Sequence, residues 1–189
     1  MQTRSFAAEF RAEGDNVAPM IEGYFSVFDS NYEIGRDLSE SIDRHAFDGA
    51  LDDDIRALVN HDTTLVLGRT KAGTLALTVD DHGLFGRVQV NPKDTDAMNC
   101  YERVRRGDVS QCSFGFDITR EDTEVREDGS VHWTIMGVKL YEVSVCTFPA
   151  YEETGVTARS DEAARLRQRA SEAWAARMLA KIRKGEENA

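Results

Sequence analysis

Segments with the composition and alternation of β-strands follow one another from about residue 3 to residue 158, and this succession limits the fold more than any other feature. Residues 65–90 are expected to form a three-stranded meander whose turns, 71–73 and 80–83, each contain a glycine. Six or more strands with a few short helices predict a mainly β, α+β fold, a closed or nearly closed β-barrel. The expected strands lie within residues 20–29, 65–70, 74–80, 84–90, around 113, and 130–151, the last segment giving two strands hinged near 137–140.

One helix is expected between the strands, over residues 94–108. Asp94 or Thr95 can cap its first turn, and Gly107 can end it. Apolar side chains at helical spacing support this assignment. Residues 45–61, which precede the meander, are expected to form a short helical or irregular connection.

The composition changes at about residue 159, which predicts a β-barrel domain of residues 1–158 and a C-terminal helical extension of residues 159–189. Residues 160–184 are rich in Ala, Arg and Glu and contain no Gly or Pro. Apolar side chains recur there every four residues, from Leu166 to Ile182, as in an amphipathic helix. Such a helix can dock on its own barrel or on a partner helix in a homo-oligomer, and the sequence leaves both open.

The overall composition excludes several classes of protein. The net charge of -11 argues against a nucleic-acid partner, because phosphate binding needs clustered Lys and Arg. The three cysteines match no zinc pattern and are typical of reduced, buried thiols. No apolar run approaches a membrane span, and the N-terminal residues lack the apolar region of a signal peptide. We therefore expect a soluble, intracellular protein without a bound metal.

Residues 111–116 read QCSFGF and place one hydroxyl in a strand. Because successive side chains of a strand point to opposite faces, the cysteine and both phenylalanines share one face, which suits a core. Ser113 and Gly115 share the other face, and the glycine leaves the surface beside Ser113 open. The serine is either a harmless residue of an edge strand or a nucleophile.

Serine becomes a nucleophile at neutral pH only when a positioned base takes its proton. Of the four histidines, His61 is the best candidate for that base, because it ends the apolar stretch IRALVNHD, where a rigid element can hold its ring at the barrel surface. His82 is expected in a solvated turn, His132 on an exposed strand and His45 near a helix end. A single histidine can equally be structural, so the assignment of His61 as a base depends on other residues around it.

A carboxylate that accepts from the other imidazole nitrogen would complete a catalytic triad. Residues 140–148 read LYEVSVCTF, and Glu142 lies there among uncharged neighbours, where a carboxylate needs a partner. That partner is either His61 or an arginine such as Arg69 or Arg106.

Three other side chains could be nucleophiles. Cys112 is disfavoured, because it shares the core face with the phenylalanines. Cys146 and Ser144 both share the face of Glu142. Cys146 is harder to dismiss, whereas Ser144 lies too close to Glu142 along one strand to leave room for an intervening imidazole.

Three segments in this order resemble the prohead maturation proteases of tailed bacteriophages, which are distant relatives of the herpesvirus protease assemblin. They are NHD at 60–62, SFGF at 113–116 and EVSVCTFPAY at 142–151. The resemblance extends over about residues 20–158. It implies a β-barrel serine endopeptidase of the assemblin type, with Ser113 as nucleophile and His61 as general base. Glu142 would replace the second histidine, which is the third triad member in assemblin-like enzymes.

The resemblance also implies the remaining parts of the site. Backbone N–H groups of Ala150 and Tyr151 are expected to bind the oxyanion, and Gly115 is expected to let an extended substrate backbone come close. No cofactor and no metal are required. The implied substrates are the scaffolding protein or the scaffold segment of the major capsid protein, and the protease itself, inside the assembling procapsid in the host cytoplasm.

Two readings compete with a serine protease. A non-catalytic assembly factor could bind scaffold and shell without cutting, and a cysteine hydrolase could use Cys146. The helix at 160–184 is expected to serve packaging, oligomerisation or autoproteolytic release.

Overall fold

The computed structural model describes residues 1–7, 11–13, 19–148, 159, 162–172 and 174–175. The chain forms two compact units. The first consists of Met1–Ser30, Ser41–Asp122 and Thr134–Glu152, and the second of Asn31–Glu40, Thr123–Trp133 and Glu153–Ala189. The boundary expected near residue 158 stays a prediction.

The described residues are mainly strands, with one long α-helix between β9 and β10. The elements are β1 Gln2–Ala7, β2 Arg11–Glu13, β3 Met20–Val27, β4 Tyr32–Gly35, β5 Leu38–Ile42, β6 Arg56–Val59, β7 Asp62–Arg69, the 3₁₀ helix η1 Thr70–Ala72, β8 Leu75–Val79, β9 Gly83–Gln89, α1 Thr95–Arg106, β10 Gln111–Val125 and β11 Val131–Cys146. Residues 162–172 are also helical.

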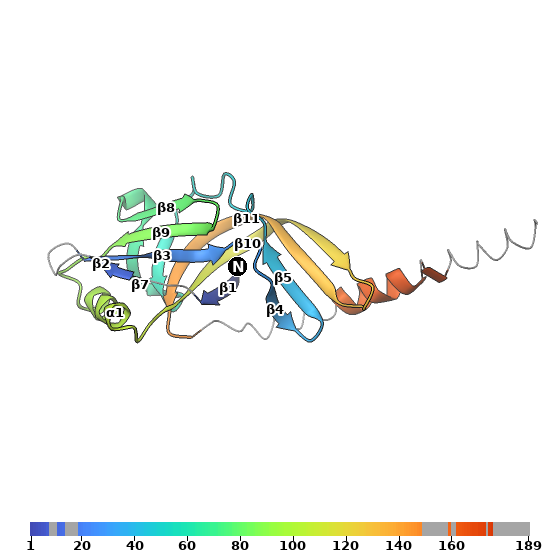
Figure 1. The fold of residues 1–189 in the computed structure, drawn as a ribbon. Coiled ribbons are helices and arrows are strands. Elements are labelled where there is room, and N and C mark those ends of the chain that lie inside the picture. Colours follow the sequence, from blue (N-terminus) through green and yellow to red (C-terminus); the bar gives the residue numbers. More distant parts are fainter. Residues whose placement is uncertain (8–10, 14–18, 149–158, 160–161, 173, 176–189) are drawn as a thin grey trace, which may run out of the picture. The chain divides into compact units, whose positions relative to one another are not determined.

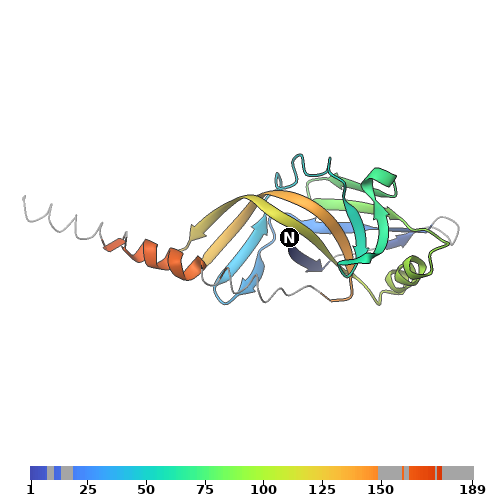
Figure 2. The ribbon, with the colours of Figure 1, turned by 180° about the vertical axis from the view of Figure 1, so that it is seen from behind.

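The strands form two sheets, which can be followed in Figures 1 and 2. The larger has the order β1-β10-β11-β5-β4, and β6 pairs with β11 in parallel and with β7 antiparallel. The smaller has the order β2-β3-β9-β8. Within the first unit the two sheets share one apolar core, because Phe25 and Leu84 of the smaller sheet belong to the same buried cluster as Phe114 and Val143 of the larger.

The closed or nearly closed barrel expected from the sequence is wrong, because neither sheet of the described residues closes on itself. The expected meander is divided between the sheets: β7 pairs with β6, whereas β8 and β9 pair with each other. The chain leaves one sheet for the other at η1, where Gly73 has a φ of 70°. The mainly β, α+β class is consistent with the structure.

Two segments form more regular strands than expected. β11 is one strand of 16 residues where a hinge near Gly137 was predicted. A side chain at Gly137 would crowd the Oγ1 of Thr119, so this glycine allows close approach of β10 rather than a break. Part of the connection expected at 45–61 forms β6.

The helix predicted over residues 94–108 is confirmed as α1. The carboxylate of Asp94 accepts from the N–H groups of Asp96 and Ala97 at its start. Gly107 ends it with a φ of 81°, which a residue without a side chain adopts at little cost. Of the predicted apolar stripe, Tyr101 and Val104 are buried and Met98 is partly buried, and Ala97 and Cys100 are buried as well.

The second unit has its own small core, formed by Leu38, Val131, Trp133 and Ala163. Ala163 belongs to the helical residues 162–172, so this part of the predicted amphipathic helix packs within its own unit. The guanidinium of Arg159 lies 4.7 Å from the ring centre of Trp133. Residues 176–184 of the predicted helix lie outside the described residues. No helix in the described ranges is long and apolar enough to cross a membrane.

Candidate functional site

His61 lies in a two-residue turn that joins β6 to β7. Val59 and Asp62 are paired across the hairpin, so Asn60 and His61 form its tip. Both tip residues have a positive φ, 51° and 61°, as the type I′ turn of tight hairpins requires. Asparagine and histidine are both enriched among non-glycine residues with a positive φ, although any side chain makes this conformation less favourable than it is for glycine.

Hydrogen bonds to the end of β11 hold this turn in place. The N–H of Asn60 donates to the carbonyl of Val145 over 3.0 Å, and the N–H of Thr147 donates to the Asn60 side chain over 2.9 Å. The N–H of His61 donates to the hydroxyl of Ser144 over 3.2 Å. These bonds offset the cost of the left-handed backbone and fix the origin of the His61 side chain.

The imidazole of His61 is paired with the carboxylate of Glu142. Nδ1 lies 2.7 Å from Oε1, and the Glu142 side chain is only 5% exposed. Because an ionised carboxylate only accepts hydrogen bonds, Nδ1 carries the proton and Nε2 of a neutral ring is left as the basic nitrogen. The expected pairing of these two residues is therefore present, and the arginine alternatives are not, since Arg69 pairs with Asp54 and Arg106 with Asp108.

The second carboxylate oxygen of Glu142 is also occupied. The hydroxyl of Ser144 donates to Oε2 over 2.5 Å, and Ser144 is fully buried. The sequence predicted that Ser144 shares the face of Glu142, but it was considered only as a weak alternative nucleophile and not as a hydrogen-bond donor to Glu142. The alternation of residues 142 and 144 was the signal that could have indicated this contact.

Cys146 lies on the opposite side of the ring from Glu142. Its Sγ is 3.9 Å from Nε2 of His61. Burial, reinforced by the charge of Glu142, raises the pKa of the Cys146 thiol to about 12. The thiol is therefore protonated at neutral pH, which disfavours the cysteine-hydrolase alternative. Cys112 belongs to the apolar core, as expected from the alternation around it.

Ser113 is fully buried, and the open surface predicted beside it is wrong. β1, which the sequence analysis did not identify, pairs with β10 and places Ser5 opposite Ser113. The hydroxyl of Ser113 donates to the carbonyl of Arg4 over 2.8 Å. In the described part of the chain, the Ser113 hydroxyl thus has a main-chain partner rather than the imidazole of His61.

Gly115 connects the strand of Ser113 to the His61–Glu142 pair. A methyl group at this position would overlap Oε1 of Glu142 and lie 3.0 Å from Sδ of Met1. The absence of a side chain therefore admits the carboxylate against β10, two residues from Ser113 on the same face. The expected contact of Gly115 with substrate stays a prediction.

The other residues singled out from the sequence have varied outcomes. Ala150 and Tyr151, expected at the oxyanion, lie outside the described residues. His82 is exposed in a turn, as predicted. His132 is not exposed as predicted: its ring is buried and its Nδ1 lies 2.8 Å from the hydroxyl of Ser39.

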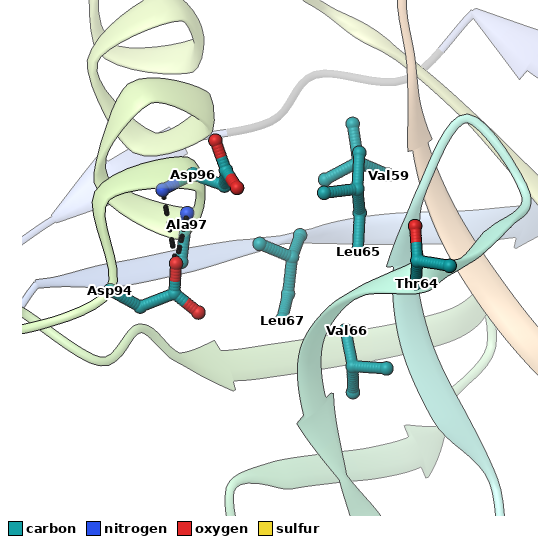
Figure 3. A pocket seen from close by; sticks show the side chains of 8 residues that line it. All are labelled: Val59, Thr64, Leu65, Val66, Leu67, Asp94, Asp96 and Ala97. Atoms are coloured by element: carbon teal, nitrogen blue, oxygen red, sulfur yellow. Dashed lines mark hydrogen bonds between the residues drawn. The ribbon is translucent and has the colours of Figure 1, made fainter.

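A cavity of about 260 Å³ lies between the hairpin that carries His61 and the start of α1 (Figure 3). Leu65 and Leu67 line it on the hairpin side, and Asp94, which caps α1, and Asp96, in its first turn, line the other side. An apolar wall opposite two carboxylates suits an apolar or basic side chain better than an acidic one. Among the described residues, no group of three His, Cys, Asp or Glu side chains is placed to hold a metal ion.

Comparison with known proteins identifies one family whose model matches most of the chain. Residues 6–169 match the family described as Caudovirus prohead serine protease. The prohead protease of Enterobacteria phage HK97 is 31% identical over 163 residues, which cover 84% of this chain and 68% of that protein. No solved structure matches the chain significantly. The matched family region includes His61, Ser113 and Glu142.

Proposed function

Because the chain belongs to the Caudovirus prohead serine protease family, we propose that it cleaves the capsid scaffold and itself during maturation of a phage procapsid. The scaffold is either a separate protein or a segment of the major capsid protein. The enzyme acts inside the assembling procapsid, in the host cytoplasm. The pairing of His61 Nδ1 with Glu142 carries this proposal, because it leaves Nε2 of the same ring as a base.

The proposed reaction is amide hydrolysis through an acyl-enzyme. Nε2 of His61 removes the proton of Ser113 while its oxygen attacks the scissile carbonyl, and Glu142 offsets the charge that develops on the ring. The imidazolium then protonates the leaving amine, and a water molecule repeats the cycle to release the acyl group. Backbone N–H groups near Ala150 and Tyr151 would bind the oxyanion, each contributing about 10²- to 10³-fold in rate.

This mechanism requires a rearrangement at Ser113. Its hydroxyl donates to Arg4 of β1 and is fully buried, so it must leave that carbonyl before it can donate to Nε2. Loosening of the β1–β10 pairing beside Ser113 would also admit the extended substrate. The reaction therefore depends on an opening at the β1 edge of β10.

The same observation favours a second candidate function. A chain whose serine stays bonded to Arg4 would be a non-catalytic factor that binds scaffold and shell during assembly. The two functions differ in what they require of Ser113. A binding factor needs no hydroxyl at this position, whereas a protease loses its nucleophile without it.

The test is co-expression with the cognate capsid and scaffolding proteins, with the mass of the capsid subunit as the readout. Ser113→Ala and His61→Ala should leave the subunit uncut, while the wild-type chain trims it. Ser26→Ala is the matched control, because Ser26 is equally buried and its hydroxyl has no hydrogen-bond partner among the described residues. Trimming by the Ser113→Ala variant would refute the proposal.

A further inference from the structure

Ser144 touches both parts of the His61–Glu142 pair. Its hydroxyl accepts a hydrogen bond from the main-chain N–H of His61 over 3.2 Å and donates one to Oε2 of Glu142 over 2.5 Å. We propose that Ser144 is a positioning residue of the protease, whose single hydroxyl fixes the backbone of His61 and the carboxylate of Glu142 together. This inference rests on the proposed function of the pair.

The hydrogen-bonding capacity of a hydroxyl fits this arrangement. A serine hydroxyl has one proton to donate and two lone pairs to accept with. The N–H of His61 can only donate, so the serine proton is left for Glu142. Each carboxylate oxygen then has one donor, Nδ1 on Oε1 and Ser144 on Oε2, and the carboxylate cannot rotate without losing one of them.

The backbone contact is equally specific. The hairpin tip places His61 at a φ of 61°, in the left-handed region, which a side chain makes less favourable than it is for glycine. The N–H that donates to Ser144 belongs to His61 itself, the residue that carries the imidazole. Ser144 of β11 therefore holds both the backbone from which the imidazole extends and the carboxylate that Nδ1 contacts.

The geometry separates this role from that of a nucleophile. The proton of Ser144 is directed at Glu142, on the Nδ1 side of the ring, whereas Nε2 faces Cys146. A nucleophile must give its proton to Nε2. Of the titratable groups in the described ranges, Glu142 and Cys146 contact the ring, while Asp62 is turned toward Thr64.

Ser144→Ala removes both contacts and adds no volume. We expect kcat to fall about 10- to 100-fold with KM nearly unchanged, because a small displacement of the base affects the chemical step. We also expect the acidic limb of the pH–activity profile to move to higher pH. Without the donor on Oε2, the carboxylate acts more strongly on the imidazolium, which then keeps its proton to higher pH.

Ser26→Ala is the matched control for this experiment, since it removes a buried strand hydroxyl that is far from the pair in sequence and that has no hydrogen-bond partner in the described part of the chain. Its kcat and pH profile should equal those of the wild type. If Ser144→Ala and Ser26→Ala have the same kcat and the same pH profile, Ser144 has no positioning role. If a serine-directed phosphonate is found by peptide mapping on Ser144 rather than Ser113, Ser144 is the nucleophile and the proposal is wrong.

A readout without substrate distinguishes this proposal from the proposed function. The NMR signals of the His61 ring should titrate differently in Ser144→Ala than in the wild type and in Ser26→Ala. If the titration differs between Ser144→Ala and the wild type while the wild-type chain cuts nothing, the positioning contact is retained and the protease is refuted. An unchanged titration would overturn the positioning role even in an active enzyme.

Discussion

Nδ1 of His61 lies 2.7 Å from Oε1 of Glu142, although 81 residues separate the two in the sequence. The histidine is at the tip of the β6–β7 hairpin and the glutamate is in β11. Parallel pairing of β6 with β11 places Val59 beside Val145 and so brings the hairpin tip to the end of β11. The contact between His61 and Glu142 therefore depends on strand pairing in the larger sheet.

Glu142→Gln keeps the shape of the side chain but removes its charge. We expect cleavage to slow by about 10²- to 10⁴-fold, because the amide no longer offsets the imidazolium and can hold the wrong tautomer. Rates of cleavage of a capsid-derived peptide measure this effect. Glu22→Gln, which removes a carboxylate paired with Arg87 in the smaller sheet, should leave the rate unchanged.

Gly115→Ala places a methyl group where Oε1 of Glu142 lies. The carboxylate must then shift from Nδ1 of His61, so we expect loss of cleavage together with a loss of about 1–3 kcal/mol in the free energy of unfolding. Chemical denaturation and peptide cleavage measure the two effects. Gly35→Ala is the matched control, since its methyl would come no closer than 3.4 Å to Leu38, and an equal loss of activity in this variant would contradict the explanation.

Cys146→Ala should retain most of the activity. Because burial raises the pKa of the thiol to about 12, Cys146 stays almost entirely protonated near neutral pH. A thiol-selective alkylator should therefore inactivate the chain slowly, whereas a serine-directed phosphonate should inactivate it at a rate set by access to Ser113. Rapid loss of activity with the alkylator, together with an inactive Cys146→Ala variant, would favour the cysteine hydrolase.

His132→Gln should reduce the acid sensitivity of folding. Burial, assisted by Arg126, lowers the pKa of His132 below the ordinary 6.5, although nearby carboxylates oppose the shift. The unfolded chain therefore binds more protons than the folded chain as the pH falls below 6.5, and stability is lost there. Denaturation measured from about pH 8 to about pH 5, a range that spans the ordinary histidine pKa, should show a smaller loss of folding stability in the variant. His45→Gln, at an exposed histidine, should behave as the wild type.

The local parts of the site could be predicted from the sequence. Alternation along single strands correctly placed Cys112 in the core and put Glu142 on the face of Cys146, and capping residues gave α1. Each of these depends on neighbours within one element. The carboxylate's need for a partner then indicated His61 as one of a few options.

The non-local parts could not be predicted. Whether β7 pairs with β6 or β8 depends on which edges meet in the folded chain, and alternation is the same in both cases. The burial of Ser113 follows from pairing of β10 in register with a strand near the N-terminus. The left-handed backbone at His61 was also missed, because it follows from the two-residue length of the β6–β7 turn, which alternation along single strands does not show.

The positive φ values of Asn60 and His61 have a consequence for insertions and deletions. A hairpin tip of two residues turns the chain without a spare residue, so one added or removed position would reverse which face the imidazole points to. Loops elsewhere on a protein surface commonly accept such changes. Among homologous chains, this tip should therefore keep its length.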